Sequence, residues 1–401
     1  MNDTQDVDAR ALAWSRRCRE ELLGSVVPFW MRHSLDREHG GYLNCLGRDG
    51  RPFDTKKHVW LQGRQVWMLA KLHTDVERRP EWLEAARLGA TFLRDHCRRP
   101  DRRVWFCVTR EGRPVQLQRK MFAECFYVMA MAQYARASGE DWAMDEARDV
   151  FSWVRAAAAD ARLAGRPVES GQEPLDSLAV PMILLNLVGE LDGDFRGEHA
   201  AVAADCARRI LAHAHDDLRL VLENVRPDGS ASLGSPEGRL VNPGHAIEAG
   251  WFLLDWAKQV GDTRVARRAL EIVEWSLDAG WDREHGGILY FLDAQGFSPV
   301  PLEWPMKLWW PHCEALVATA MAWRHTRDPR WFRRFEQIAT WTFEHFPDRE
   351  HGEWFGYLDR AGAVTHRFKG GPYKGCFHVP RALWLTDRVL AQDGPAPIGP
   401  A

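Results

Sequence analysis

The sequence lacks the features that mark disulfide-rich, zinc-binding, secreted and membrane proteins. Its eight cysteines are scattered, without a CxxC pair or the density of a disulfide scaffold, so we expect reduced thiols and no structural zinc. No apolar run approaches the roughly 18 residues that a membrane-spanning helix needs. The N-terminal residues have neither the basic nor the apolar region of a secretory signal. These absences predict a cytoplasmic protein that does not contact a membrane.

A strong charge of one sign and an internal linker are also missing. The formal net charge of −3 offers no basic surface for nucleic acid. No Ser/Gly linker, charge block or change in composition divides the 401 residues. We therefore predict one domain over residues 1–391, followed by a Pro/Gly-rich tail at 392–401 that is expected to be disordered.

Several common catalytic motifs are absent as well. The sequence contains no HExxH, no GxxxxGK[ST], no GxSxG, and no GxGxxG that opens a helix after a strand. Zinc protease, P-loop, serine hydrolase and dinucleotide-binding interpretations therefore have no support.

What the chain does contain is a repeated motif. Asp36-Arg-Glu-His-Gly-Gly41 recurs as Asp282-Arg-Glu-His-Gly-Gly287 and as Asp348-Arg-Glu-His-Gly352, and looser copies begin near Asp101 and Asn224. The starts are about 60 residues apart except for one double gap, which predicts a degenerate unit near residue 163. Six units of this length each have room for two helices and a hairpin.

Each unit contains one amphipathic helical segment, whose polar face is expected to meet solvent (a wet face), and one segment that is apolar on nearly all sides. The wet-faced segments are 11–33, 80–97, 144–164, 199–215, 264–279 and 331–346. The apolar segments, which should be inner helices, are 60–72, 119–135, 178–191, 245–260, 305–323 and 377–390. An open stack of such pairs would need polar capping units, and neither terminal unit is polar. The pattern therefore predicts an all-α fold, a closed α/α six-barrel in which twelve helices form a double ring.

Short β-like stretches around a glycine turn lie between the two helices of four units. They cover residues 42–53, 104–115, 288–300 and 354–366. We predict β-hairpins there, in the loops at the end of the barrel where the inner helices begin.

The stretch Asn242-Pro-Gly-His-Ala-Ile-Glu-Ala-Gly-Trp251 leads from a loop signal into an apolar helix, with Asn242 as the expected cap. His245 and Glu248 share one face of that helix at i and i+3. Burying either group costs several kcal/mol unless it is paired. A lone histidine in such a helix is more often a satisfied core residue, so a functional interpretation depends on what converges with it.

Because the inner helices of a closed double ring begin at the same end, their first turns are predicted to meet at one cleft. Those turns supply Trp60, Gln62, Arg64, Glu124, His245, Glu248, Trp309, Trp310, Glu314, Tyr373 and His378. Two histidines, an arginine and carboxylates above an aromatic floor suit proton abstraction next to a carbonyl. Taken singly, these residues fit surface ion pairs, helix caps or core packing equally well. Glu124, Glu248 and Glu314 also leave glycoside hydrolysis open.

Four long motifs, in this order, resemble the N-acylglucosamine 2-epimerase family, also called renin-binding proteins. The motifs are Trp60-Leu-Gln-Gly-Arg-Gln-Val-Trp67, Asn242 to Trp251, Lys307-Leu-Trp-Trp-Pro-His-Cys-Glu314 and Lys369-Gly-Gly-Pro-Tyr-Lys-Gly-Cys-Phe-His-Val-Pro380. The similarity runs from about residue 10 to 390. Cellobiose and mannose epimerases and aldose-ketose isomerases of the family match these motifs less closely.

The resemblance implies an isomerase that interconverts N-acetylglucosamine and N-acetylmannosamine in amino sugar metabolism, supplying a sialic acid precursor. It implies a homodimer that needs no metal or cofactor for its chemistry and uses ATP as an activator that is not consumed. By motif position, His245 and His378 are the acid/base histidines, Arg64 is the oxyanion partner, and Glu248 and Glu314 are orienting carboxylates. The residues expected to bind the sugar are Trp60, Gln62, Glu124, Lys307, Trp309, Trp310, Lys369 and Tyr373.

Unit three carries Val180-Pro-Met-Ile183 where disaccharide-using members of the family carry a histidine-rich segment. This difference favours a small acylamino sugar. The alternatives are a mannose/glucose 2-epimerase or an aldose-ketose isomerase of the same fold, and a non-catalytic sugar- or protein-binding relative. The sequence does not determine which histidine acts on which epimer, or where a nucleotide binds.

Overall fold

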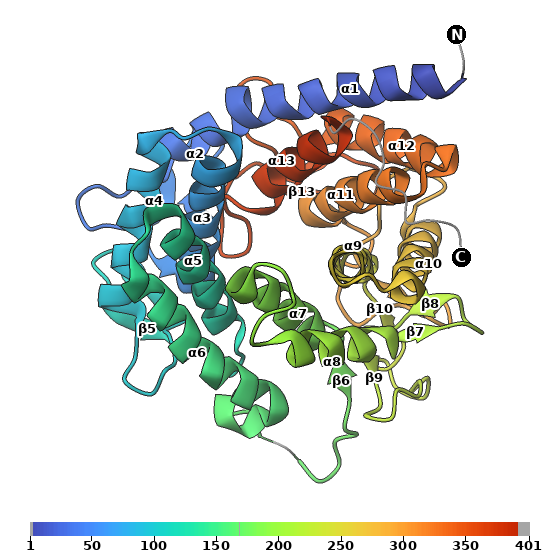
Figure 1. Ribbon diagram of the computed structural model, residues 1–401, viewed down its shortest axis with the longest axis horizontal. Coiled ribbons are helices and arrows are strands. Elements are labelled where there is room, and N and C mark those ends of the chain that lie inside the picture. Colours follow the sequence, from blue (N-terminus) through green and yellow to red (C-terminus); the bar gives the residue numbers. More distant parts are fainter. Residues whose placement is uncertain (1–2, 168, 392–401) are drawn as a thin grey trace.

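The computed structural model describes residues 3–167 and 169–391, so the predicted tail at 392–401 lies outside the described residues. The chain is mostly helical, as predicted, and its helices alternate between an outer and an inner layer (Figure 1). The first outer helix is α1 (Asp3–Glu21), which continues through the π-helical turn η1 (Leu22–Val26) into α2 (Val27–His33). The other outer helices are α4 (Pro80–Phe92) with η3 (Leu93–Cys97), α6 (Asp141–Ala159) with the 3₁₀ turn η4 (Ala161–Ala164), α8 (Ala200–Leu211), α10 (Thr263–Gly280) and α12 (Pro329–His345). The inner helices are α3 (Val59–Lys71) with η2 (Leu72–Val76), α5 (Phe122–Ser138), α7 (Ala179–Asp192), α9 (Pro243–Val260), α11 (Trp309–Thr326) and α13 (His378–Ala391).

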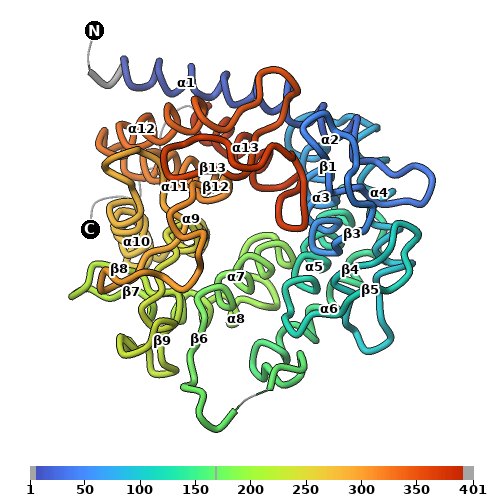
Figure 2. Tube along the Cα trace, turned by 180° about the vertical axis from the view of Figure 1, so that it is seen from behind, coloured from blue at the N-terminus to red at the C-terminus, as the bar shows by residue number. Residues whose placement is uncertain are grey.

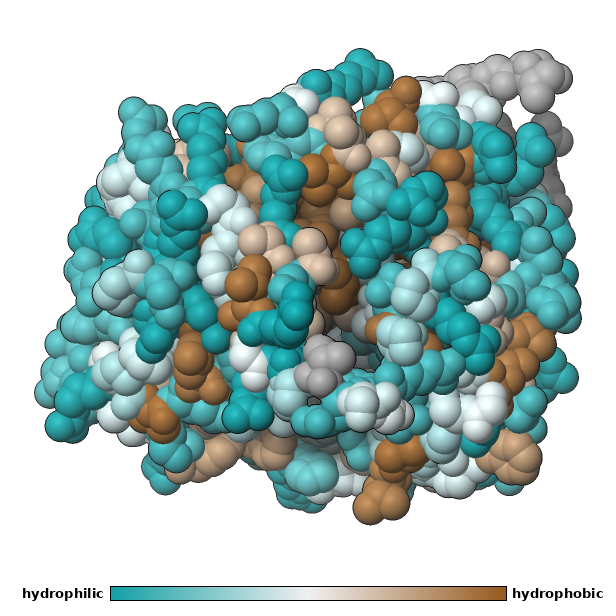
Figure 3. Space-filling view, turned by 90° about the horizontal axis from the view of Figure 1, so that it is seen from below, coloured by the Kyte–Doolittle hydropathy of each residue, from teal (hydrophilic) through white to brown (hydrophobic). Residues whose placement is uncertain are grey.

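The two layers follow from the two kinds of hydrophobic pattern. In α12 the side chains of Phe332, Phe335 and Ile338 share one buried face, while the opposite face meets solvent. In α11 every residue from Trp309 to Ala320 is buried, so this helix must be surrounded by protein. Figure 3 shows one side of the molecule, which is mostly hydrophilic, with apolar side chains gathered in a hollow near its middle.

Short strands and long loops lie in front of the ring in the view of Figure 2. The strands are β1 (Cys45–Leu46), β2 (Pro52–Asp54), β3 (Lys57–His58), β4 (Cys107–Val108), β5 (Pro114–Gln116), β6 (Asp176–Ser177), β7 (Ala214–His215), β8 (Leu220–Val221), β9 (Asn224–Val225), β10 (Leu240–Val241), β11 (Leu292–Asp293), β12 (Lys307–Leu308), β13 (Tyr357–Leu358) and β14 (Val364–His366). They pair, antiparallel throughout, as β1-β2, β3-β4-β5, β6-β9, β7-β8, β10-β11 and β12-β13-β14.

Three of the predicted hairpins form, and one does not. The strands β1-β2, β4-β5 and β13-β14 pair around their glycine turns. In the segment 288–300, β11 instead pairs with β10, with Leu240 opposite Asp293. The turn itself is present, because the Gly296 amide donates to the Asp293 carbonyl at 3.0 Å. The chain then runs through Pro299 and Pro301, which lack the amide hydrogens that a returning strand would need.

The repeated Asp-Arg-Glu-His-Gly motif has a structural role that all three copies share. Each aspartate is buried and accepts hydrogen bonds from a buried lysine of its own unit and from an arginine in a neighbouring hairpin. The triplets are Asp36 with Lys57 and Arg110, Asp282 with Lys307 and Arg360, and Asp348 with Lys369 and Arg48. Since Arg48 belongs to the first hairpin and Asp348 to the last unit, this contact joins the beginning of the chain to its end.

The first and last helices also lie side by side. Ser15 of α1 donates to the Asp387 carboxylate of α13 at 2.6 Å. Trp67 of α3 packs against Phe377, immediately before α13, with ring centroids 5.4 Å apart. Most buried apolar residues form one cluster, and a small second cluster of Leu222, Val225 and Val241 lies beneath the strands around residue 223.

Two predictions made from absences can be set against the structure. All eight cysteines lie in the described residues, and each is a buried free thiol. Among the described helices, none combines the length and the apolar character needed to cross a membrane.

Candidate active site

His245 stands at the beginning of α9, where the local sequence fixes its position. The Asn242 side chain caps the helix by accepting a hydrogen bond from the His245 amide at 3.2 Å. The imidazole Nδ1 of His245 lies 3.0 Å from Oε2 of Glu223. Since a carboxylate only accepts, Nδ1 carries the hydrogen, and Nε2 is the nitrogen available for proton transfer. The His245 side chain is 29% exposed, so a substrate can reach it.

His378 begins α13 and has the same arrangement with a different carboxylate. Its Nδ1 donates to Oε1 of Glu314 on α11 at 2.8 Å, which again leaves Nε2 for chemistry. The other oxygen of Glu314 accepts a hydrogen bond from Trp251 Nε1 at 3.0 Å. In the part of the chain that the structure describes, neither histidine has a hydrogen-bond partner for its Nε2.

Arg381 distinguishes the surroundings of the two histidines. One nitrogen of its buried guanidinium donates both to Glu248 at 2.7 Å and to Glu314 at 2.6 Å. Glu314 is therefore shared between Arg381 and His378, whereas Glu223 contacts no arginine or lysine in the part of the chain that the structure describes. The carboxylate beside His245 thus has no arginine or lysine partner among the described residues, whereas the carboxylate beside His378 shares the positive charge of Arg381 with Glu248.

These charges shift the pKa values of the two histidines in opposite directions. Burial lowers the pKa of His245, but the charge and hydrogen bond of Glu223, with the further carboxylates of Glu248 and Glu314, outweigh it, so that pKa is raised. Burial and then the positive charges of Arg381 and Arg64 hold the pKa of His378 well below its ordinary value. His245 therefore keeps its proton to a higher pH than an ordinary histidine does, and His378 loses its proton at a lower pH.

Trp310, at the beginning of α11, contacts the rings of both histidines. Its ring centroid is 5.2 Å from that of His245 and 5.9 Å from that of His378. Trp309 packs behind His378 and against Tyr357, and its Nε1 is buried without a hydrogen-bond partner. Trp310 consequently forms a flat apolar surface on which a sugar ring can lie between the two bases.

Arg64 lies in the second turn of α3, and within the described residues its guanidinium forms no ion pair with a carboxylate. Its guanidinium lies 3.9 Å from the ring centroid of Phe126 and 5.4 Å from that of Phe377, and its Nε is buried without a partner. Arg381 lies on the same Phe377 ring at 4.5 Å, which places the two arginines together. Burial, partly offset by Glu248, lowers the pKa of Arg64 to about 9. An arginine without a counter-ion is suited to receive a negative charge that develops during a reaction.

Trp60 and Tyr373 lie together at the more exposed edge of this cluster. Trp60 Nε1 donates to the Pro372 carbonyl at 2.9 Å, and the Trp60 ring meets the Tyr373 ring edge-on at 5.8 Å. Tyr373 is 65% exposed. The structure therefore allows the predicted contact of these two residues with a substrate.

Gln62 and Glu124 do not face the cleft, contrary to the prediction that they bind the sugar. Both side chains are fully buried. The Gln62 amide exchanges hydrogen bonds with the backbone of Tyr42, and its Oε1 accepts from the Tyr42 amide at 2.7 Å. Glu124 accepts a hydrogen bond from Arg103 Nε at 3.0 Å. Their polar atoms hold loops against the inner helices, so we leave both residues out of the proposed site.

Lys307 and Lys369, which were also predicted to bind the sugar, do not face the cleft either. Each ammonium group is buried and paired with an aspartate of the repeated motif, Lys307 with Asp282 at 2.9 Å and Lys369 with Asp348 at 3.0 Å. These contacts use the lysines to anchor the loops that precede α11 and α13. They position the active-site helices and are not placed to bind the sugar.

Glu223 and Arg381 were not predicted from the sequence. Arg381 lies three residues after His378, and the i,i+3 spacing on a helix was a signal that could have found it. Glu223 follows β8, and its backbone amide donates a hydrogen bond to the Leu240 carbonyl at 2.8 Å, which holds the residue in place. It is 22 residues away from His245 in the sequence, and no local pattern marks it.

One group of active-site side chains resembles a metal site by distance alone. Ligand atoms of Glu248, Glu314 and His378 lie within 4.8 Å of one another. The guanidinium of Arg381 already donates to both carboxylates. Its positive charge therefore balances the negative charges that a metal ion would otherwise neutralise.

Comparison with known proteins shows which family the chain resembles. The family profile of N-acylglucosamine 2-epimerase (GlcNAc 2-epimerase) matches residues 41–382. The chain is 48% identical over 390 residues to the N-acylglucosamine 2-epimerase of Bos taurus, covering 94% of this chain and 91% of the bovine protein. It is 46% identical over 402 residues to that of Rattus norvegicus, covering 96% of this chain and 95% of the rat protein. The structure of cellobiose 2-epimerase from Bacillus thermoamylovorans shares the fold, with a TM-score of 0.81 at 20% identity over 94% of this chain and 99% of that chain. The chain belongs to the N-acylglucosamine 2-epimerase family.

Proposed function

We propose that the protein is a sugar 2-epimerase that interconverts N-acetyl-D-glucosamine and N-acetyl-D-mannosamine. The observation that carries this proposal is the pair of histidines that both contact the Trp310 ring. Each has its Nδ1 on a carboxylate and its Nε2 without a protein partner. Inversion at C2 requires a base on one face of the carbon and an acid on the other, and two such histidines supply both.

The reaction follows from the open-chain sugar. The C1 aldehyde acidifies the hydrogen on C2, so a neutral imidazole can remove that proton. Arg64 stabilises the negative charge that develops on the C1 oxygen of the resulting enolate, because within the described residues no carboxylate is paired with its guanidinium. The second histidine then returns a proton to the opposite face. Glu223 and Glu314 hold the two rings in the tautomer that presents Nε2, and no redox cofactor takes part.

The unequal charges assign the resting roles. Neutral His378 is the base and protonated His245 the acid for the sugar that binds with its C2 hydrogen toward His378, and the other epimer reverses them. The proposed profile of kcat/KM against pH is a bell. Activity falls as pH drops through the depressed pKa of His378, and it falls again as pH rises through the elevated pKa of His245.

Solvent deuterium provides the test of this mechanism. With N-acetylmannosamine in D₂O, the proton removed by one histidine exchanges with solvent, and the product receives its C2 hydrogen from the other. NMR should show deuterium at C2 of the product from the first turnover, with slower incorporation into unreacted substrate. Product that retains full protium at C2 would contradict two separate bases. With free mannose as the substrate, a ketose product that retains the migrating proton would replace the proposal with an aldose-ketose isomerase.

Four further properties are part of the proposal. The helix order and the joined chain ends support a closed α/α six-barrel of one domain. The family resemblance supports a cytoplasmic homodimer, which light scattering of the purified protein would test. It also supports ATP as a non-consumed activator, to which we assign no residues. Rate measurements with and without ATP, together with recovery of unchanged nucleotide, would test this activation. A product that serves as a sialic acid precursor is proposed on the same ground.

A further inference from the structure

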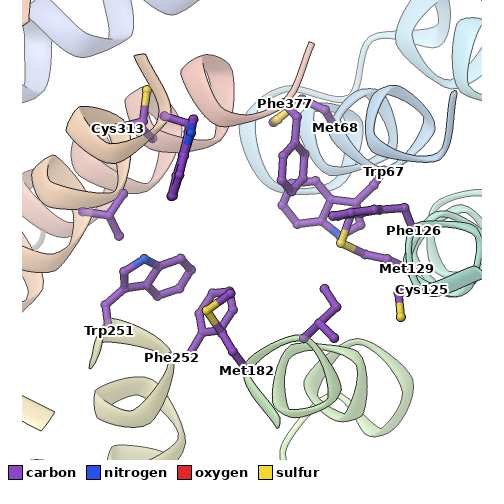
Figure 4. Packing of buried hydrophobic residues seen from close by; sticks show 14 of the residues in the cluster. Trp67, Met68, Cys125, Phe126, Met129, Met182, Trp251, Phe252, Cys313 and Phe377 are labelled. Carbon is purple, nitrogen blue, oxygen red and sulfur yellow. The ribbon is translucent and has the colours of Figure 1, made fainter. Parts of the chain in front are cut away.

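One side of the cleft is apolar, and the mechanism described above does not use it. Met182 on α7, Trp251 and Phe252 on α9, and Phe126 on α5 point toward the middle of the ring (Figure 4). They retain 6 to 8% exposure, whereas Met68, behind Trp67, has none. Their direction in Figure 4, together with this remaining exposure, places the four side chains along the inside of the ring.

The apolar side begins directly beside the reacting groups. Trp251 donates to Glu314, which holds His378, and its ring packs against Phe252 at 4.3 Å. At the other end of the apolar side, the Phe126 ring packs against the Arg64 guanidinium. Around the ring, α5 and α7 lie across from α11, which bears Trp310 (Figure 1). A substituent on C2 that points away from Trp310 therefore points toward Phe126 and Met182.

The first turns of α7 differ from those of the inner helices that carry the chemistry. Between Ala179 and Ile183 the chain has no ionisable or hydrogen-bonding side chain. A hydroxyl group placed against this surface would lose its hydrogen bonds to water without replacement, which costs free energy. In an N-acetylhexosamine, every ring carbon bears oxygen or nitrogen, and the acetyl methyl is the one carbon group that prefers an apolar surface.

We propose that Met182, Phe252 and Phe126 bind the N-acyl chain of the substrate, and that Met182 limits its length. This inference rests on the proposed function and adds the determinant of acyl specificity to it. It explains why an unreactive apolar surface lies beside two charged catalytic groups. The contact exists in both the substrate and the transition state, so it acts mainly on substrate binding.

Acyl-chain length provides the test. The wild-type protein and Met182→Ala would be assayed with N-acetyl-, N-propanoyl- and N-butanoylmannosamine, with the epimer measured by NMR. For the wild type we expect kcat/KM to fall by about tenfold or more for each added methylene, within the range that one methylene supplies in an apolar pocket. In Met182→Ala, N-butanoylmannosamine should regain a kcat/KM within about threefold of the N-acetyl sugar. Met68→Ala is the matched control and should leave the order of the three sugars unchanged.

The outcomes separate this inference from the proposed function. A wild type that epimerises the N-acetyl sugar while Met182→Ala lowers all three rates equally would overturn the acyl site alone. A folded wild type without turnover on any N-acyl sugar would overturn the proposed function. If Met182→Ala does not fold, Met182→Gln replaces it, because glutamine has a similar shape and a polar end. That variant should raise KM for the N-acetyl sugar about tenfold or more with little change in kcat, and an unchanged KM would contradict the proposal.

Discussion

Replacing Asp348 with alanine is expected to destabilise the protein strongly although the residue takes no part in catalysis. Asp348 is 5% exposed and receives hydrogen bonds from Arg48 and from the fully buried Lys369. In the variant the Lys369 ammonium keeps the carbonyl oxygens of Gly352 and Glu353 and the face of the Phe355 ring, but it loses its paired carboxylate. Removing one partner of a buried ion pair costs about 3 to 5 kcal/mol, because the other charge remains buried.

This free energy converts into a measurable change in melting temperature. Unfolding entropy is about 2.1 cal/mol/K per residue, which for 401 residues gives roughly 0.8 kcal/mol/K. A loss of about 3 to 5 kcal/mol therefore lowers Tm by about 4 to 6 °C, as followed by calorimetry or circular dichroism. Asp282→Ala, which removes the equivalent contact to Lys307, should behave alike.

Asp101→Ala provides the matched control. Asp101 begins the looser copy of the motif in the second unit, but its side chain is 49% exposed and its partner Arg99 is also near the surface. Exposed ion pairs contribute about 0 to 1 kcal/mol, so the Tm of this variant should change by no more than about 1 °C. An Asp348→Ala variant that melts like the Asp101→Ala variant would refute the reasoning from buried pairs.

The same contact predicts how stability depends on pH. Burial raises the pKa of Asp348, but hydrogen bonds from Arg48 and Lys369 outweigh it and hold that pKa well below its ordinary range. A carboxylate with a depressed folded-state pKa stabilises the fold above its unfolded pKa of about 3.9 and loses this contribution as pH falls toward the folded value. The difference in Tm between wild type and Asp348→Ala should therefore be constant near neutral pH and shrink below about pH 4.

The remaining predictions concern the active site. Glu223→Gln removes the charge that raises the pKa of His245, so the basic limb of kcat/KM against pH should move to lower pH, and a limb that stays in place would contradict the role of Glu223. Arg381→Met removes a charge that lowers the pKa of His378, so the acid limb should move to higher pH; if only Tm changes, Arg381 is structural alone. His245→Ala and His378→Ala should each reduce kcat by about 10²- to 10⁴-fold with an unchanged circular dichroism spectrum, and near-normal turnover would exclude that histidine from the mechanism. Arg64→Met should reduce kcat by about 10²- to 10³-fold, and a rise in KM alone would indicate that Arg64 only binds the sugar.

Local patterns in the sequence determined the helices and the position of His245. Apolar residues that recur on one face or on all faces distinguish outer from inner helices, because each pattern can be buried in only one way. Asn242 followed by Pro243 marks where α9 begins, and the structure places the cap there. The sequence also predicted that His378 lies at the beginning of its helix, and in the structure α13 starts at that residue.

The pairing of side chains was decided by the tertiary structure. Lys307 and Lys369 stand in the same motifs as Trp310 and His378, yet both are buried against aspartates and hold loops. Proximity to active-site residues along the chain therefore does not place a side chain in the cleft. Glu223 shows the converse, because strand pairing brings it to His245 from a separate loop. The spacing of residues along one helix is encoded in the local sequence. An ion pair between two separate elements depends on where those elements lie in space, and only the folded chain determines their positions.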